Sequence, residues 1–354
     1  MSARKTPGVE FPDLYSLRQG AAPMEARSAE SLPNEPGEWQ FEPKWDGFRC
    51  LAFKEAGVIE LKGKSGTSLS RFFPEVVATL MDVPFERFVV DGELVIELNG
   101  RMTFDALQAR LHPAASRIRR LSEETPARLI LFDMLVGTDG SPVGALALTE
   151  RRSALEAFGE KAAIAGKLIV TPCTRDLIQA TQWLDDFDRD GRDGVVAKRL
   201  DGKYLSGERA MIKVKRSRTA DCVVGGFRYQ SQSPEVGSLL LGLHNAQGLL
   251  DHVGFTSTIV NAERLALTQK LRALGAPPGF TGRAPGGQSR WSTERSGEWE
   301  PLRPELVVEV RYDHVTGGRF RHGTKLLRFR PDKPARQCTI DQIIPRPRAP
   351  SEDE

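Results

Sequence analysis

Short apolar runs separated by turn residues are the feature that most constrains the fold. Four runs in the first part of the chain are rich in β-branched residues: "RFVVDGELVIEL", "ARLILFDMLV", "GVVAKRL" and "MIKVK". Such runs, bounded by Gly, Pro and Asp, are typical of strands. Two intervening stretches, "LTERRSALEAFGEKAA" and "TRDLIQATQWLDDFDRDG", have helical spacing, and Thr149 is predicted to cap the first. The pattern predicts an α+β domain with antiparallel sheets, not a doubly wound fold.

The second part of the chain has a different pattern of predicted secondary structure. From Thr219 onward, short strand-like runs and turns surround a single amphipathic stretch, "NAERLALTQKLRALG". A few strands with one helix predict a small five-stranded Greek-key barrel, the OB-fold. The predicted domains are therefore residues 1–218 and residues 219–345. Residues 346–354 are polar and rich in proline, so we expect a disordered tail.

The cysteines and the apolar runs argue against several classes of protein. The four cysteines are scattered, which argues against a disulfide framework or a C-x-x-C zinc site. Apolar runs are too short to span a membrane, and the N-terminal stretch lacks the apolar core of a signal peptide. We therefore expect a cytoplasmic monomer without a membrane partner.

Positive charge is concentrated in two places, although the formal net charge is only +3. Residues 303–336 contain nine Lys or Arg against four Asp or Glu, and "ARLHPAASRIRR" contains four Arg and no acid. Such clusters are typical of polyanion binding, and a solvated face is the ordinary alternative.

A lysine in the stretch "FEPKWDGFRC", residues 41–50, is the main candidate for covalent chemistry. The ordinary interpretation is a strand that ends in an Asp-Gly turn, with Lys44 facing water. A lysine that attacks phosphorus must first lose its proton, and only about one in a few thousand is neutral at pH 7. Partial burial or a neighbouring cation would favour the neutral amine.

Acidic residues occur two positions after Lys44 and on two other predicted strands or their ends. They are Asp46, Asp91, Glu93 and Asp193. Carboxylates that converge from separate strands need a cation between them, and Mg²⁺ binds both carboxylate and phosphate oxygens. We therefore expect these acids to form a metal site, although "VVDGELV" alone is more typical of a type I′ hairpin turn.

Four cations alternate with apolar neighbours on the same strands: Arg49, Lys198, Lys213 and Lys215. Lys213 and Lys215 are two residues apart, so they are predicted to share one face of a strand. A lone lysine pair usually faces solvent, but the further cations that follow in "VKRSR" fit contacts of this pair with nucleotide phosphates or a nucleic-acid backbone.

The order of the motifs resembles the ATP-dependent DNA ligases. "KWDGFR", "VVDGELV", "LILFDML", "DGVVAKR", "MIKVK" and "RFRPDK" follow one another between about Trp39 and Thr339. The chain is most similar to the small two-domain C-type bacterial enzymes, which are linked to repair, recombination and end joining. The resemblance implies a nucleotidyltransferase domain, an OB-fold domain, ATP as cofactor and Mg²⁺ or Mn²⁺.

The resemblance also implies a three-step reaction. Lys44 matches the lysine that attacks the α-phosphorus of ATP, releases pyrophosphate and carries AMP. AMP then passes to the 5′-phosphate of nicked duplex DNA, and the adjacent 3′-OH displaces it to seal the strand. Positioning and charge neutralisation supply most of the catalysis in such transfers. Asp46 matches an acid of the joining step, Arg49 matches a contact to the ribose or terminal phosphate, and Glu42 matches a nucleotide-binding position.

Further matches complete the implied nucleotide site. Glu93 matches an acid of the nucleotide-sugar and metal site, and Phe132 matches the aromatic residue that stacks on adenine. Asp193 stands where the family usually has a metal-binding Glu, and its shorter side chain changes its reach by roughly one carbon–carbon bond. Lys213 and Lys215 match the lysines that contact the α-phosphate.

The second domain carries one implied motif. Arg330, Asp332 and Lys333 match the residues that orient the departing pyrophosphate. This motif is distant from Lys44 in sequence, so it could act only if the second domain closes over the first and later swings away to admit DNA.

The contact to the 5′-phosphate of the nick departs from the family pattern. Lys64 stands at the position of a family arginine, and it offers a point charge in place of a planar fork. Arg71 is close in sequence and is the other candidate for this role.

Other interpretations share part of this pattern. An RNA ligase or a GTP-using capping enzyme has the same lysine motif, and a non-catalytic OB-fold nucleic-acid binder could retain an inactive nucleotidyl domain. Sealing of DNA against RNA, and use of ATP against GTP, would separate them. Ku-like end-joining proteins or a repair polymerase are the partners that an end-joining role would imply.

Overall fold

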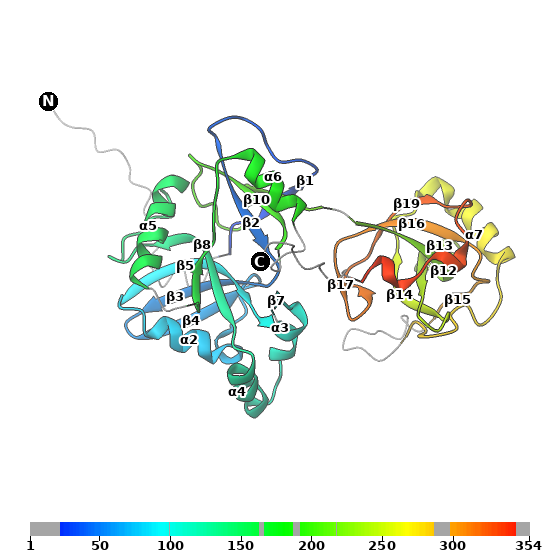
Figure 1. The fold of residues 1–354 in the computed structure, drawn as a ribbon, viewed down its shortest axis with the longest axis horizontal. Helices are drawn as coiled ribbons and strands as arrows, with labels where there is room; N and C mark the ends of the chain where they lie inside the picture. Colours follow the sequence, from blue (N-terminus) through cyan, green and yellow to red (C-terminus); the bar gives the residue numbers. More distant parts are fainter. Residues whose placement is uncertain are drawn as a thin grey trace, which may run out of the picture. The chain divides into compact units, whose positions relative to one another are not determined.

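The computed structural model describes residues 22–98, 100–162, 166–186, 192–216, 218–286 and 298–344. The chain forms two compact units, which divide between residues 216 and 217 (Figure 1). The predicted tail, residues 346–354, lies outside the described residues. Among those residues, no helix is long and apolar enough to cross a membrane.

The first unit contains two principal sheets. One has the order β4-β3-β5-β8-β9 and the other the order β1-β11-β10-β2. The strands of the first are β4 (Val58–Gly63), β3 (Phe48–Glu55), β5 (Arg87–Val95), β8 (Arg128–Val136) and β9 (Leu168–Val170). Those of the second are β1 (Ala26–Ala29), β11 (Met211–Val214), β10 (Arg192–Arg199) and β2 (Trp39–Trp45). The predicted strands are confirmed, and "VVDGELV" lies within β5 and forms no hairpin turn.

Most strand pairs in these sheets are antiparallel, as predicted. Two edge pairs are parallel instead: β8 with β9, and β1 with β11. In the first pair, Lys167 accepts a backbone hydrogen bond from Leu129, so β9 joins the edge after the chain has crossed over through a helix. The expectation of purely antiparallel sheets is therefore wrong at these two edges.

Both faces of the five-stranded sheet are buried. On one face, Val90, Leu94 and Leu131 pack with residues of α2 (Pro74–Met81) and α5 (Leu148–Lys161). On the other face, Leu51 and Val89 pack with residues near the second sheet. The near-continuous apolar runs of β5 and β8 follow from this double burial.

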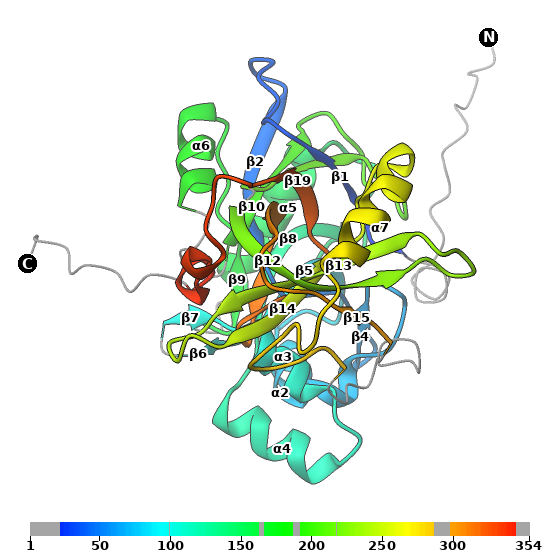
Figure 2. The same cartoon turned by 90° about the vertical axis from the view of Figure 1, so that its right-hand side faces the viewer.

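Three further α-helices lie in the described part of the first unit. α6 (Leu177–Asp185) packs on the second sheet, where Ala180 and Leu184 contact the core of β2 and β10. α3 (Phe104–Arg110) and α4 (Ala115–Glu124) follow β5, and α4 lies at the edge of the unit in both views (Figure 1 and Figure 2). A small ribbon pairs β6 (Glu97–Leu98) with β7 (Arg101–Met102).

The start of α5 differs from the prediction. Ala147 is the N-cap residue, and the Glu150 carboxylate accepts a hydrogen bond from its backbone N–H at 3.2 Å. Thr149 lies in the first turn, where its backbone N–H donates to Leu200 O. The prediction that Thr149 caps the helix is wrong because the glutamate already satisfies the first backbone donor.

The second unit is built on one antiparallel sheet with the order β14-β13-β12-β16-β19. Its strands are β12 (Arg218–Tyr229), β13 (Val236–His244), β14 (Leu250–Thr256), β16 (Val307–Tyr312) and β19 (Lys325–Phe329), and β15 (Glu300–Pro301) pairs with β12. A short ribbon of β17 (Val315–Thr316) and β18 (Arg319–Phe320) precedes β19, and the single helix predicted there is α7 (Arg264–Ala273).

The sheet of the second unit has an open strand order, with β14 at one edge and β19 at the other. An isolated parallel bridge joins Thr256, at the end of β14, to Thr324, just before β19. Within the described residues this is not a closed barrel, so the OB-fold stays a prediction. The five strands and one helix agree with the coarser expectation of a small all-β domain.

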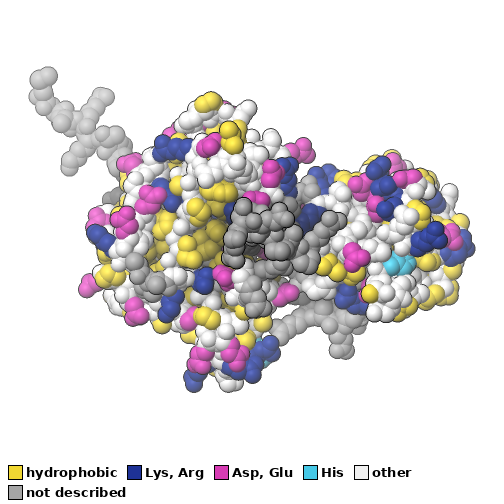
Figure 3. Space-filling view, viewed as in Figure 1, with side chains coloured by type: hydrophobic (Ala, Val, Ile, Leu, Met, Phe, Trp, Pro, Cys, Tyr) yellow, Lys and Arg dark blue, Asp and Glu magenta, His cyan; other side chains and the backbone are white. Residues whose placement is uncertain are grey.

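Charged side chains cover both units without strong segregation on the face seen in Figure 3. Lys and Arg side chains alternate there with Asp and Glu on each unit, which agrees with the small net charge. The arginines of α4 illustrate this mixture, because Arg120 pairs with Glu124 on the next turn at 3.7 Å.

Candidate active site

A cavity in the first unit brings together side chains from both sheets. It gathers seven of the predicted site residues: Glu42, Lys44, Lys64, Arg49, Glu93, Phe132 and Lys213. Main-chain segments far apart in sequence therefore meet at one place. Pro23, Met24 and Glu25, which the sequence did not single out, also form part of its wall.

Lys44 lies at the end of β2 and forms an ion pair with Asp193 on β10. The Lys44 Nζ atom is 2.8 Å from Asp193 Oδ1, and Lys215 Nζ is 2.8 Å from Asp193 Oδ2. Asp193 is buried, with 3% of its side chain exposed. One buried carboxylate is thus shared by two ammonium groups.

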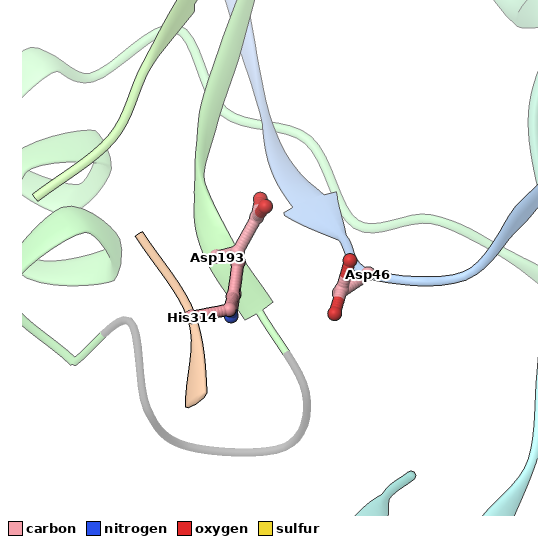
Figure 4. Close-up of side chains that lie close together, drawn as sticks. All are labelled: Asp46, Asp193 and His314. Carbon is pink, nitrogen blue, oxygen red and sulfur yellow. The ribbon is translucent and has the colours of Figure 1, made fainter. Parts of the chain in front are cut away.

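Asp46 completes the acidic side of this cluster. Figure 4 shows Asp46 beyond the end of β2 and Asp193 on β10. Their ligand oxygens lie within 4.8 Å of each other. The third side chain labelled in that figure, His314, belongs to the second unit.

Two glycines, Gly47 and Gly194, allow the backbone of neighbouring strands to come close to theirs. A Cβ atom at Gly47 would clash with the carbonyl oxygen of Leu94, and one at Gly194 would clash with that of Val214. The Asp-Gly pairs after Lys44 and at Asp193 are therefore close backbone contacts. Gly194 lies within β10, so a turn does not explain the second of these pairs.

The pKa of Lys44 is raised, contrary to the expectation that the site favours a neutral amine. Burial alone would lower this pKa, but the negative charges of Asp193 and Glu93 outweigh burial. The ion pair therefore holds Lys44 as a cation in the absence of a ligand. The expected partial burial is present, with 22% of the Lys44 side chain exposed.

Glu93 supplies a second carboxylate to the cavity. Its Oε1 atom accepts a hydrogen bond from the Gly47 backbone N–H at 3.1 Å. Burial raises the pKa of Glu93 to about 7, against the lowering effect of Lys44 and Arg49. The carboxylates of Asp46, Asp193 and Glu93 are the hard oxygen donors that Mg²⁺ or Mn²⁺ prefers, so the site has the chemistry to hold such an ion.

Asp91 does not join these acids. Its carboxylate receives two hydrogen bonds of 2.6 Å from Arg49, and Tyr204 donates a third at 2.6 Å. Arg49 also donates to Met24 O at 3.0 Å. The expectation that Asp91 contributes to a metal site is wrong, because its lone pairs are used to orient Arg49.

Lys198 also makes polar contacts within the protein. Its ammonium group lies 2.8 Å from Glu42 Oε2 and donates to Phe132 O at 2.7 Å. Only 4% of its side chain is exposed. Lys198 lines the cavity, and its donors serve Glu42 and the backbone at Phe132.

Lys64 and Arg71, the two candidates for the nick 5′-phosphate, lie in different places. Lys64 lines the cavity, where it forms an ion pair with Glu25 at 3.1 Å. Arg71 lines a separate surface hollow and donates to His112 O and Pro113 O at 3.3 and 3.2 Å. Geometry therefore favours Lys64 for any contact with a ligand in the cavity.

Lys213 lines the same cavity from β11. Burial lowers its pKa, and the nearby positive charges of Lys44, Lys215 and Lys64 lower it further. The pocket is lined by four lysines, Lys44, Lys64, Lys198 and Lys213, and an anionic ligand would relieve the mutual repulsion of their ammonium groups.

The predicted motif of the second unit forms its own cluster. Arg330 donates to both Asp332 oxygens, the shortest contact being 2.8 Å, and to Asp221 Oδ1 at 2.9 Å. Lys333 Nζ lies 3.9 Å from Asp221 Oδ2. Asp332 stays 62% exposed, and its hydrogen bonds from Arg330 lower its pKa to about 2. Asp221 contacts both Arg330 and Lys333, and no motif in its local sequence predicted it as a site residue.

Comparison with known proteins gives a consistent family. Residues 21–215 match the family described as ATP dependent DNA ligase domain, and residues 232–333 match the ATP dependent DNA ligase C terminal region. DNA ligase C2 of Mycolicibacterium smegmatis is 42% identical over 93% of this chain and 96% of that protein. The multifunctional non-homologous end joining protein LigD of Mycobacterium bovis is 28% identical over 88% of this chain and 39% of that protein.

A solved structure from a study of Lig E DNA ligases has a similar fold. Its TM-score is 0.56 at 18% identity, and the match covers 87% of this chain and 99% of that chain. At this identity the likeness bears on the fold alone.

Proposed function

The chain belongs to the ATP-dependent DNA ligases, and from that premise we propose that it seals nicks in duplex DNA through AMP bound covalently to Lys44. The observation that carries the proposal is the position of Lys44, which lies in a cavity with four further lysines or arginines and forms an ion pair with the buried carboxylate of Asp193. A nucleophile, cations for phosphate and acids for a metal ion are the groups that nucleotidyl transfer needs.

In the first step, Lys44 Nζ forms a bond to the α-phosphorus of ATP while the bond to pyrophosphate breaks. Lys44 must lose a proton beforehand, and Asp193 is the carboxylate paired with the ammonium group, with 2.8 Å between Lys44 Nζ and Asp193 Oδ1. A divalent cation bound by Asp193, Glu93 and Asp46 would neutralise phosphate charge and compete with Lys44 for these carboxylates. The ammonium groups of Lys213 and Lys215 are proposed to balance the charge of the α-phosphate.

The remaining residues have proposed roles in nucleotide recognition. Glu42 and Phe132 form the side of the cavity that would take the adenine, with the Phe132 ring as a stacking surface. Arg49, oriented by Asp91, would contact the ribose or terminal phosphate. Lys64 would contact the 5′-phosphate of the nick, and this contact would replace its ion pair with Glu25.

In the next two steps, AMP moves from Lys44 to the 5′-phosphate, and the 3′-OH then attacks that phosphorus and expels AMP. Asp46 is the acid proposed to assist the last step. Arg330, Asp332 and Lys333 are proposed to orient pyrophosphate during the first step, and the second unit is proposed to be an OB-fold domain. Repair or end joining is the proposed setting, and Ku-like or polymerase partners, the cytoplasm and a monomeric state stay predictions.

The test is the intact mass of the denatured protein after incubation with Mg²⁺ and either ATP or GTP. We expect one AMP to be added with ATP only and removed again by pyrophosphate. Lys44→Ala should not gain AMP, whereas Lys203→Ala, an exposed lysine outside the cavity, should behave as the wild type. AMP transfer to the Lys44 variant would refute the assignment.

Two alternatives have distinct outcomes in the same assay. Covalent GMP with GTP would indicate a capping-type enzyme, and sealing of nicked RNA in preference to DNA would indicate an RNA ligase. A protein that binds duplex DNA without gaining or losing AMP under any treatment would be the non-catalytic binder.

A further inference from the structure

A buried ion pair lies behind the cavity wall that carries Phe132. Arg151 on α5 donates to Asp133 on β8 through Nε at 2.7 Å and through Nη2 at 3.1 Å. Each side chain is only 1% exposed. Arg151 Nη1 also donates to Leu146 O at 2.8 Å and to Gly202 O at 2.7 Å. The pair therefore touches no ligand, and its effect on the site must pass through other residues.

Asp133 directly follows a β-bulge. In the pairing of β5 with β8, Asp91 lies opposite Asp133 and Gly92 lies opposite Leu131, so Phe132 is the extra residue. A bulge interrupts the alternation of side chains and re-aims the bulged residue. Here Leu131 and Met134, three positions apart, both enter the same core, while Phe132 lines the cavity.

The bulge is held from both sides by charged groups. On one side, Asp133 is fixed by Arg151 and by the Met134 backbone N–H, which donates to Asp133 Oδ1 at 3.0 Å. On the other side, Lys198 donates to the carbonyl oxygen of Phe132 itself at 2.7 Å.

Lys198 extends the network to a second strand of the cavity. Its Nζ atom lies 2.8 Å from Glu42 on β2 and 3.9 Å from Asp133 Oδ2. Glu42 also accepts a hydrogen bond from Gln40 at 2.8 Å. A chain of alternating charges thus runs from Arg151 through Asp133 and Lys198 to Glu42, entirely in buried surroundings, where such interactions are strong and depend on one another.

We propose that Arg151 and Asp133 are positioning residues of the nucleotide site, which fix the bulge at Phe132 and, through Lys198, the carboxylate of Glu42. The inference rests on the proposed function, because it takes the cavity as the nucleotide site. A small displacement of a group that orients a substrate lowers the reaction rate or affinity strongly. Loss of the pair should therefore impair the use of ATP more than it impairs folding.

The chain contains a matched control for a purely structural role. Arg110 is another fully buried arginine of the first unit; it pairs with Glu75 at 2.8 Å and donates to the carbonyl oxygens of Phe72 and Thr125. It does not line the cavity. Arg110→Met should destabilise the protein in the same way as Arg151→Met without affecting nucleotide use.

The experiment measures the rate of self-adenylylation of the full chain against ATP concentration, together with the melting temperature. We expect Arg151→Met to raise the KM for ATP about tenfold, which corresponds to ~1.4 kcal/mol. Arg110→Met should leave KM within about twofold of the wild type at a similar loss of melting temperature. Equal changes of KM in the two variants would overturn the inference.

A double variant separates stability from positioning if Arg151→Met leaves too little folded protein. Arg151→Met combined with Asp133→Asn removes both buried charges, so it should recover much of the melting temperature. We expect its KM to stay raised, and a KM that returned to the wild-type value with the melting temperature would overturn the inference. Failure of the wild type to gain AMP after pretreatment with pyrophosphate, which removes any AMP already bound, would overturn the proposed function, and this inference with it.

Discussion

The ammonium group of Lys44 lies 2.8 Å from the carboxylate of Asp193, although 149 residues separate them in the chain. The antiparallel pairing of β2 with β10 creates this contact, since Gly194 is the register partner of Lys44. The same carboxylate binds Lys215. Asp193 therefore influences both the charge of the proposed nucleophile and the position of a lysine that is proposed to bind phosphate.

Asp193→Asn should slow self-adenylylation by at least about 100-fold, because a neutral amide can neither balance two lysines nor hold a divalent cation. Asp193→Glu restores the residue that the family usually has and should retain activity within about tenfold. Single-turnover transfer of labelled AMP measures both. Asp201→Asn, an exposed acid that pairs with Arg199, is the control. An active Asn variant would contradict the central role of Asp193.

Asp332→Ala should slow self-adenylylation more than it slows the sealing of a nick that already carries AMP. The reason is that pyrophosphate is present only in the first step, so a residue that orients pyrophosphate matters only there. We expect about a tenfold loss in the first assay and less than about threefold in the second. Glu305→Ala, an exposed acid that pairs with Arg303 in the same unit, should alter neither rate. Equal losses in both assays would remove Asp332 from this role.

Lys54→Met should destabilise the first unit without a direct effect on the cavity. The Lys54 ammonium group is buried and donates to three carbonyl oxygens at the end of α2: Leu80 at 3.2 Å, Met81 at 2.7 Å and Val83 at 2.7 Å. Loss of a donor that serves several buried acceptors costs about 2–3 kcal/mol. Chemical denaturation measures the change. Lys167→Met, at an exposed lysine, should change the free energy of unfolding by less than about 0.5 kcal/mol. Similar midpoints for the two variants would contradict the prediction.

Acid should destabilise the second unit through His252. Burial lowers the pKa of His252 to about 3, and the positive charges of Arg319, Arg228 and Arg283 add to this effect. The unfolded chain binds a proton near pH 6.5, whereas the folded chain excludes it until about pH 3. The stabilisation is therefore complete above pH 6.5 and is lost as the pH falls toward 3.

The loss between pH 6.5 and pH 5 should be about 2 kcal/mol for this one group. Unfolding monitored at several pH values would measure it, with His252→Gln as the comparison. The variant should be less stable at neutral pH and should lack this part of the pH dependence. An unchanged pH dependence would show that other groups cause the acid sensitivity.

The sequence alone determined the elements and most members of the site. The periodicity of β-branched and apolar residues predicted the strands of both units, because double burial in a sheet leaves a strong local signal. The order of short motifs predicted Lys44, Glu93, Phe132 and Lys213 as site residues, and these line one cavity. Local patterns carry such information because each motif is only a few residues long.

Only the tertiary structure decided which of these residues are paired with one another. Asp91 binds Arg49, Lys198 serves Glu42 and the backbone, and Asp221 gathers the motif of the second unit. These pairings depend on strand register, and the bulge at Phe132 breaks the alternation from which side-chain direction would be inferred. Register is set by contacts between segments far apart in the chain, so no local pattern of residues reveals which charge meets which.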